Sequence, residues 1–167
     1  MPLAIYLTLL IEMIFVSYVD LKRKKISNNW IFVNCLLYAA SLFFFPKIYF
    51  FSWEVLIIPI SFLFVGYILF LLKIMGAGDS KYLAMLFLLI PLRLQEEYFL
   101  TLTYITIWVG LILLSYNSIK NYEKLIVAYK LKDVRIVKGV YGKKFSYAPV
   151  ILFSWVSLGW VIRSEFF

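Results

Sequence analysis

The stretch Gly76-Ala77-Gly78-Asp79-Ser80-Lys81 lies between two long apolar runs. An acidic side chain beside a membrane span costs free energy unless it is paired, hydrated or used in chemistry. Gly76 and Gly78 carry no side chains, so an extended substrate backbone can approach Asp79 closely. One interpretation is that Asp79 only caps the following helix by accepting backbone N–H groups. The other is that Asp79 acts in chemistry together with a second aspartate, Asp20.

The composition indicates a polytopic membrane protein. Of the 167 residues, 64% are hydrophobic, which is more apolar surface than a soluble domain of this length can bury. We therefore expect one membrane-embedded domain over residues 1–167 with an all-α fold, a helical bundle. The net charge of +8 comes from basic residues clustered between the apolar runs, so we expect no nucleic-acid partner. The first run lacks the basic segment and cleavage site of a signal peptide, and we expect it to be a retained span.

Several kinds of catalytic site are excluded by residue types that the chain lacks. Histidine is absent, which excludes Ser-His and Cys-His pairs and the His-Glu-x-x-His metal site. The one cysteine, Cys35, lies in an apolar run and is expected to be buried there as a small apolar side chain. Ser80 and Lys81 are adjacent and point to different sides of a helix, so they do not form a Ser-Lys pair. A hydrolase of this composition depends on carboxylates, and we expect no metal and no cofactor.

Six apolar runs predict six transmembrane helices, at residues 2–19, 30–45, 53–75, 81–92, 98–116 and 147–162. The fourth run is shorter than the roughly 20 residues that a span needs, so we expect other helices to surround it. Pro59 and Gly66 in the third run are tolerated where neighbouring helices pack against them.

The polar segment between the fifth and sixth runs, residues 117–146, is strongly basic. Against two acidic residues it carries eight basic ones: Lys120, Lys124, Lys130, Lys132, Arg135, Lys138, Lys143 and Lys144. Apolar side chains recur there at helical spacing: Ile119, Tyr122, Leu125, Ile126 and Tyr129. This pattern predicts an amphipathic helix on an anionic inner leaflet. A plain solvated loop is the alternative.

The distribution of basic residues predicts the orientation of the protein in the cell (inner or plasma) membrane. Lys and Arg concentrate in cytoplasmic loops. The basic cluster at residues 22–25, the turn before the fourth run and residues 117–146 are therefore expected to be cytoplasmic, with both termini outside. Asp20 ends the first span and Asp79 begins the fourth, so both lie at one depth on the cytoplasmic face.

Asp20 and Asp79 together suggest an aspartic hydrolase site. The helix dipole disfavours a negative charge where Asp20 lies, at the C-terminal end of a helix. An ion pair with the following lysines is the structural explanation. Two close carboxylates share a proton. The charged one activates water as a general base, and the protonated one polarises the scissile carbonyl. The substrate must be extended, because a helix hides its carbonyl groups in hydrogen bonds.

Three segments resemble the motifs of the type IV prepilin peptidases. Residues 20–28, Asp-Leu-Lys-Arg-Lys-Lys-Ile-Ser-Asn, resemble the first motif, an aspartate followed by a basic stretch and Ile-Pro-Asn. Residues 76–81 resemble the second motif. Residues 145–149, Phe-Ser-Tyr-Ala-Pro, resemble the Pro-Tyr-Ala-Pro segment that opens the last span. The resemblance covers the whole chain in order, but Ser27 and Ser146 stand where the family often has proline.

The resemblance implies an integral-membrane aspartic endopeptidase with Asp20 and Asp79 as its catalytic pair. Such enzymes remove the basic leader from prepilins or prepilin-like secretion and competence proteins, cutting after glycine at the cytoplasmic face. Gly76, Gly78, Asn28 and Lys81 are then expected to bind substrate or shape loops. The implied partners are a prepilin-like protein and a bilayer with an anionic inner leaflet.

The resemblance is to the short, peptidase-only form of the family. Many members carry a further segment with paired Cys-x-x-Cys and methylate the new N-terminus, whereas this chain has one cysteine. Archaeal preflagellin peptidases are similar in layout.

Two other functions stay open. One is an intramembrane protease of the presenilin or signal-peptide-peptidase kind, whose partner aspartate lies within a span. The other is a non-enzymatic carrier or assembly subunit whose carboxylates, with Glu12, bind protons or cations. Glu12 lies on the same helix face as Asp20, ~12 Å away along the axis, and alternatively makes a buried hydrogen bond. Lys73 and Lys81 flank the glycine turn; they hold substrate, tune Asp79 or only anchor the cytoplasmic face.

Overall fold

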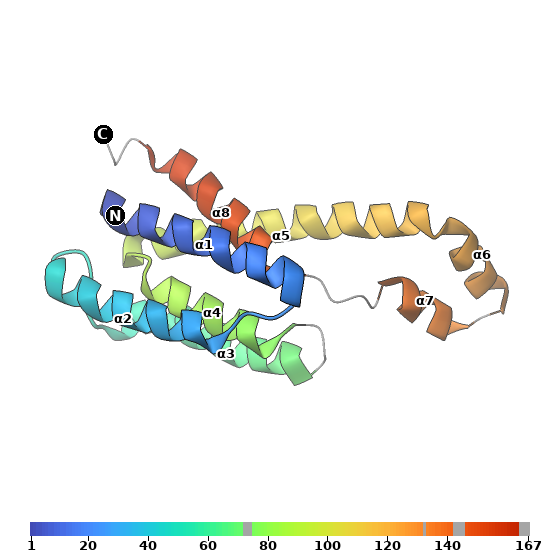
Figure 1. Ribbon diagram of the computed structural model, residues 1–167, viewed down its shortest axis with the longest axis horizontal. Helices are drawn as coiled ribbons and strands as arrows, with labels where there is room; N and C mark the ends of the chain where they lie inside the picture. Colours follow the sequence, from blue (N-terminus) through green and yellow to red (C-terminus); the bar gives the residue numbers. More distant parts are fainter. Residues whose placement is uncertain (72–74, 132, 142–145, 164–167) are drawn as a thin grey trace.

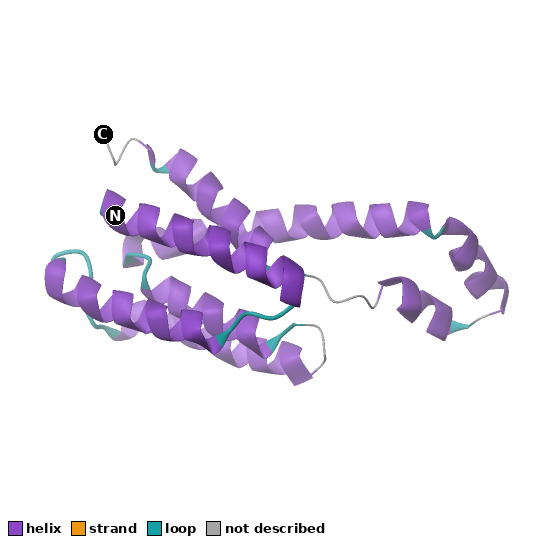
Figure 2. Cartoon of the chain, in the orientation of Figure 1, coloured by secondary structure: helices purple, strands orange, loops and turns teal. Residues whose placement is uncertain are grey.

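The computed structural model describes residues 1–71, 75–131, 133–141 and 146–163. Every regular element in these ranges is an α-helix (Figure 2), which confirms the all-α expectation. In chain order the helices are α1 (Leu3–Arg23), α2 (Asn28–Phe44), α3 (Trp53–Leu71), α4 (Ala77–Leu88), α5 (Leu92–Lys120), α6 (Tyr122–Leu131), α7 (Val134–Tyr141) and α8 (Ala148–Val161).

The helices of the bundle pack in two groups (Figure 1). In one group α8 lies between α1 and α5, and in the other α4 packs against both α2 and α3. The helix α4 has 12 residues, and its apolar side chains, such as Leu83, Leu86 and Phe87, are almost completely buried. Other helices therefore surround this short apolar run in place of lipid, as expected. The helix α5 extends beyond the bundle and carries α6 and α7 at its far end.

A series of aromatic contacts joins the two groups. The ring of Phe87 on α4 contacts Tyr98 on α5 with centroids 5.2 Å apart. Tyr98 meets Trp155 on α8 edge to face at 5.5 Å, and Trp155 stacks on Tyr6 of α1 at 5.1 Å. Aromatic pairs of this kind stabilise the fold beyond what the burial of their apolar surface contributes. The core is therefore continuous across both groups.

The outer surface of the bundle is apolar, as expected for a protein embedded in a bilayer. Phe43, Trp108 and Trp160 are 80%, 65% and 72% exposed. Among the described residues α1, α3 and α5 are long and apolar enough to cross a membrane, while α2 and α8 are shorter apolar helices. Pro59 and Gly66, which we expected where neighbouring helices pack together, are both buried in α3. A Cβ atom on Gly66 would collide with the side chain of Ser80, so this glycine allows α3 and α4 to pack closely.

The expectation that Cys35 is buried was wrong, because its side chain is exposed. The buried face of α2 is formed instead by Asn34, Tyr38 and Ser41. Adjacent residues in a helix point about 100° apart, so Cys35 faces outward next to the buried Asn34. A helix that turns polar groups inward and apolar groups outward is typical of membrane bundles.

The boundaries near the basic segment also differ from the prediction. The fifth helix continues to Lys120, and α6 begins at Tyr122, so the expected helix is present from Tyr122 to Tyr129 and only Ile119 lies in α5 instead. The side-chain amide of Asn121 donates a hydrogen bond to the carbonyl of Asn117, 3.0 Å away. Such bonds compete with helix continuation, and the chain turns at this residue. A second helix, α7, follows where none was predicted.

Candidate active site

Asp20 lies on the buried face of α1 and is 3% exposed. The helix continues to Arg23, so Asp20 lies one turn before the end of the helix and does not terminate it as predicted. The left-handed conformation of Lys24, with φ of 52°, closes the helix, and its N–H donates to the carbonyl of Asp20. This helix end therefore fixes the backbone of Asp20 at one end of the bundle.

Residues 146–148 form a strap that holds Asp20 from the other end of the chain. The hydroxyl of Ser146 donates to the carbonyl oxygen of Asp20 at 3.1 Å. The backbone N–H of Ala148 donates to Oδ2 of Asp20 at 3.3 Å. Lys24 Nζ donates to the Ser146 hydroxyl oxygen at 2.9 Å. Among the described residues no ion pair joins Asp20 to the lysines that follow it, but the Lys24 ammonium interacts electrostatically with the Asp20 carboxylate, so the lysine acts at longer range than an ion pair.

Asp79 is the third residue of α4 and is half-buried. Its Oδ2 accepts a hydrogen bond from the backbone N–H of Gly76, 3.2 Å away. Gly76 is the N-cap residue, so Asp79 does contribute to the helix start, but from the third helical position rather than as the N-cap. This arrangement is the acidic half of a capping box. The other carboxylate oxygen of Asp79 is not used by this bond.

The two carboxylates lie close enough to influence each other. Asp79 precedes the apolar part of α4 and lies outside the three helices that are long enough to span a membrane. Burial, together with the negative charge of Asp20, raises the pKa of Asp79 to about 6, against a lowering effect of the Gly76 hydrogen bond. Like charges at short range cannot both ionise without cost. The structure therefore brings together the two aspartates that the sequence singled out.

Gly78 allows the segments that carry Asp20 and Asp79 to come close to each other. A Cβ atom at Gly78 would lie 2.8 Å from the carbonyl oxygen of Ile26. Ile26 is buried in the loop after α1. The glycine therefore accommodates the backbone of this protein itself, which agrees with the loop-shaping alternative expected for it; substrate binding by Gly78 stays a prediction. By allowing the loop after α1 to touch the start of α4, Gly78 draws Asp20 and Asp79 together.

The sequence matches the model of the type IV leader peptidase family over residues 7–116. The chain belongs to the type IV leader peptidase family. The matched residues include Asp20, Gly76, Gly78 and Asp79 and end before the strap. Comparison with curated proteins and with solved structures finds no significant match. Membership of a leader peptidase family, together with the apolar helices, makes this chain a membrane protease.

The side chains of Asn28 and Lys81 are both exposed. Asn28 is the first residue of α2, and its side chain is exposed. Lys81 follows Asp79 by two residues and is also exposed. In the described part of the chain neither side chain hydrogen-bonds Asp20 or Asp79. Lys73, the other basic residue of the turn, lies outside the described residues.

Glu12 belongs to a second buried polar group of the leader peptidase. Glu12, Asn34 and Tyr82 are 5%, 0% and 1% exposed. The side chains of Asn34 and Tyr82 face the carboxylate of Glu12. Yet their terminal polar atoms make no direct hydrogen bond to any described residue. The buried location of Glu12 agrees with the prediction, and Asn34 and Tyr82 are the polar side chains that interact with its carboxylate.

The strap and the Glu12 partners are the site features that the sequence did not reveal. Ser146, Tyr147 and Ala148 belong to the third motif, yet no role followed from their spacing, since 128 residues separate Asp20 from Ala148. Asn34 and Tyr82 are polar residues inside apolar runs, and that signal could have marked them as inward-facing.

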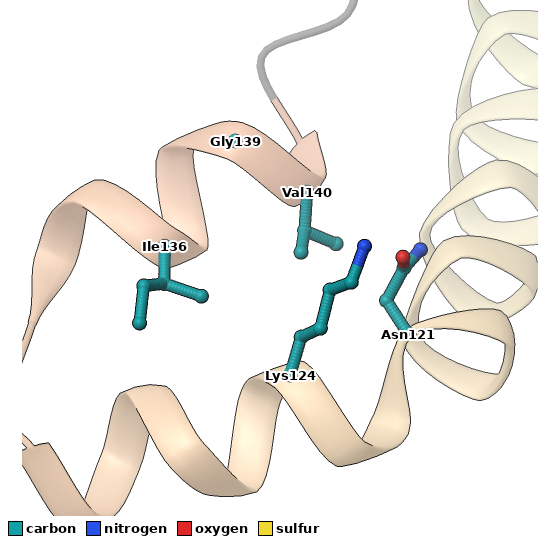
Figure 3. Close-up of a pocket in the computed structure, with 5 residues that line it drawn as sticks. All are labelled: Asn121, Lys124, Ile136, Gly139 and Val140. Carbon is teal, nitrogen blue, oxygen red and sulfur yellow. The ribbon is translucent and has the colours of Figure 1, made fainter.

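A separate cavity lies between α6 and α7 (Figure 3). It has a volume of about 220 Å³ and is lined by residues of α6, α7 and the turn before them: Asn121, Lys124, Ile136, Gly139 and Val140. The Lys124 ammonium points into it beside the Asn121 amide. The cavity contains none of the predicted site residues.

Proposed function

We propose that this protein is an aspartic endopeptidase that removes the basic leader peptide of type IV prepilin-like proteins at the cytoplasmic face of the membrane. The observation that carries the proposal is the meeting of Asp20 and Asp79 at one end of the bundle, in a member of a leader peptidase family. Each helix group supplies one of the two acids.

The environments of the two carboxylates support different roles. The pKa of Asp79 is raised to about 6 by burial and by Asp20, so Asp79 is the member that holds the shared proton. Each carboxylate accepts one backbone N–H, Asp20 from Ala148 at 3.3 Å and Asp79 from Gly76 at 3.2 Å. Asp20 also interacts with the positive charge of Lys24, which favours its charged form. Asp20 is therefore the general base, and Asp79 is the acid.

Hydrolysis then follows without a covalent intermediate. Asp20 removes a proton from a water molecule, and the water oxygen bonds to the scissile carbonyl carbon. At the same time the proton of Asp79 passes to the carbonyl oxygen. When the C–N bond breaks, the proton on Asp20 passes to the leaving amine and the hydroxyl proton returns to Asp79. One proton remains on the pair after each turnover.

Six membrane crossings and a cytoplasmic site form part of the same proposal. The start of α1 and the end of α8 lie at the same end of the bundle (Figure 1), as an even number of crossings requires. The opposite end carries both aspartates, Lys22, Arg23 and the α6–α7 segment. Basic residues concentrate on the cytoplasmic side, and an anionic inner leaflet would attract them.

The test is leader removal from a co-expressed prepilin-like protein. We expect Asp20→Asn and Asp79→Asn each to lower cleavage at least about 100-fold, because general acid–base groups contribute that much or more. Asp133→Asn is the matched control, since Asp133 only accepts a local N–H from Arg135 at 2.8 Å. Equal amounts of each variant in the membrane fraction show that the protein still inserts. Normal cleavage by either active-site variant would contradict the proposal.

A second candidate function is an intramembrane protease of the presenilin kind. One observation favours it: α1 continues past Asp20 to Arg23, so this aspartate lies within a helix. Substrates distinguish the two functions. A leader peptidase cleaves beside the basic leader at the membrane boundary, whereas an intramembrane protease cleaves within the apolar segment, and mass spectrometry of the products locates the cut.

A further inference from the structure

Tyr147 lies in the strap between the two residues that contact Asp20, and the proposed reaction does not use it. Its side chain is half-buried. The hydroxyl oxygen lies 2.8 Å from Oγ1 of Thr106 on α5 and interacts electrostatically with the Asp79 carboxylate. Tyr147 therefore reaches from the Asp20 side of the site towards Asp79.

The direction of the hydrogen bonds determines what the Tyr147 hydroxyl can offer. The hydroxyl of Thr106 donates to the carbonyl oxygen of Leu102 at 2.7 Å. A hydroxyl group has one proton and two acceptor lone pairs. Since the Thr106 proton is engaged, Tyr147 donates its own proton to Thr106. The Tyr147 oxygen is then left as an acceptor that interacts electrostatically with Asp79.

An extended peptide supplies the matching donor. A peptide that has left the helical state carries backbone N–H groups on each side of the scissile bond. A backbone N–H that enters a half-buried site without an acceptor costs free energy. The proposed acid, Asp79, must keep its proton for the scissile carbonyl. Tyr147 is an acceptor beside it that the reaction leaves available.

We propose that Tyr147 is a substrate-binding residue whose hydroxyl oxygen accepts a hydrogen bond from a backbone N–H of the extended peptide next to the scissile bond. This inference rests on the proposed function. The bond fixes which carbonyl group of the peptide lies at Asp79. Thr106 contributes by holding the Tyr147 proton away from the substrate.

The chain contains a matched control for this hydrogen-bond pattern. The hydroxyl of Tyr141 on α7 lies 2.7 Å from Oγ of Ser118. Ser118, like Thr106, donates to a carbonyl of α5, that of Leu114, at 2.7 Å. Tyr141→Phe therefore removes the same kind of bond as Tyr147→Phe, twelve residues along α5 from Thr106 and away from the aspartates.

The experiment measures cleavage of a synthetic prepilin-like peptide by the purified full-length protein in lipid vesicles. We expect Tyr147→Phe to raise KM about three- to tenfold with a smaller change in kcat, as the loss of one hydrogen bond to substrate predicts. Tyr141→Phe is expected to leave both constants unchanged.

Peptides with single ester bonds then identify the donor. Each ester replaces one backbone N–H near the cut, leaving the scissile amide intact. One position is expected to raise KM for the wild-type protein by a similar factor but not for Tyr147→Phe, because that variant has already lost the acceptor. A merely structural role of Tyr147 would not produce this position-specific difference.

The results distinguish a failure of the proposed function from a failure of the role of Tyr147. Failure of the wild-type protein to cleave any prepilin-like peptide contradicts the proposed function itself. Cleavage with an unchanged KM in Tyr147→Phe, or an ester series that affects both proteins alike, overturns only the role of Tyr147. If Tyr147→Phe does not accumulate in the membrane, Thr106→Val is used instead. It frees the Tyr147 proton to turn towards Asp79, so the same rise in KM is expected, and an unchanged KM overturns the inference.

Discussion

The backbone N–H of Ala148, the first residue of α8, donates a hydrogen bond to Oδ2 of Asp20 near the end of α1, 3.3 Å away. The last helix therefore orients an acid supplied by the first. Ser146 adds a second bond, to the carbonyl oxygen of the same aspartate. Because both bonds come from the strap, its position and the orientation of Asp20 are coupled.

Ser146→Ala tests this coupling. The change removes the hydroxyl that binds the Asp20 carbonyl and the Lys24 ammonium, so both lose a partner. We expect an unfolding free energy lower by about 1 kcal/mol and a kcat several-fold lower with little change in KM. Ser61→Ala is the control, because the exposed hydroxyl of Ser61 donates within its own helix, to the carbonyl of Ile57 at 2.7 Å. Thermal unfolding and cleavage kinetics measure the two effects. An unchanged kcat would show that the strap does not orient the acid.

Gly78→Ala tests the contact that brings the aspartates together. The new Cβ would lie 2.8 Å from the Ile26 carbonyl oxygen, and the loop after α1 must move to admit it. Overpacking of this kind costs about 1–3 kcal/mol, and we expect cleavage to fall at least about tenfold as Asp20 and Asp79 separate.

Gly110→Ala is the matched control for that change. Gly110 lies in α5, and a Cβ there has no atom within 4 Å. Alanine favours a helix more than glycine does, so stability is expected to hold or rise and cleavage to stay the same. Equal activity of both alanine variants would contradict the role of Gly78.

The pH dependence of stability tests the environment of Asp79. In the folded protein burial and Asp20 raise the pKa of Asp79 from 3.8 to about 6, so the folded state loses stability relative to the unfolded state as pH rises across this interval. An amide at this position does not titrate, so Asp79→Asn is expected to raise Tm above pH 6 and to have less effect at pH 4. Thermal unfolding of both proteins in detergent between pH 4 and a pH above 6 measures this difference in Tm. A Tm difference that does not change with pH would show that the carboxylate is not perturbed.

Glu12→Gln separates structure from chemistry in the second polar group. The Glu12 carboxylate is buried and has no direct hydrogen bond to a described residue. A neutral amide of the same shape costs less to bury and adds N–H donors for Asn34 and Tyr82. We expect a Tm that is equal or higher, with cleavage unchanged. Loss of cleavage in a folded Glu12→Gln protein would assign Glu12 to the reaction or to proton movement. Glu54→Gln, at an exposed position, should change neither.

Much of the architecture was predictable because its signals are local. Apolar runs predicted the helices of the bundle, and the missing histidine directed attention to Asp20 and Asp79. The position of Asp79 at the start of a helix followed from the apolar run after it. Even the burial of α4 followed from its length, since a run too short to cross lipid has to be covered by protein.

The contacts that complete the site were not predictable, because they depend on distant parts of the chain. No local pattern states that Gly78 lies against Ile26 rather than against a substrate. The strap meets Asp20 across 128 residues. The predicted boundary between α5 and α6 was wrong for a different reason. The Asn121 side chain hydrogen-bonds a carbonyl group of α5, and the spacing of apolar residues does not reveal such a bond. The prediction that Cys35 is buried was wrong because a helix that is apolar on all sides gives no sign in the sequence of which face points inward.

The division of the bundle into two helix groups has a mechanical consequence. Asp20 belongs to the group of α1, α5 and α8, and Asp79 to the group of α2, α3 and α4, so the proposed catalytic pair lies where the two groups meet. Its geometry therefore depends on the aromatic contacts that hold the groups together as well as on each helix. If the two aspartates catalyse hydrolysis, an apolar molecule that enters from the lipid and separates the groups is expected to inhibit it without resembling a peptide.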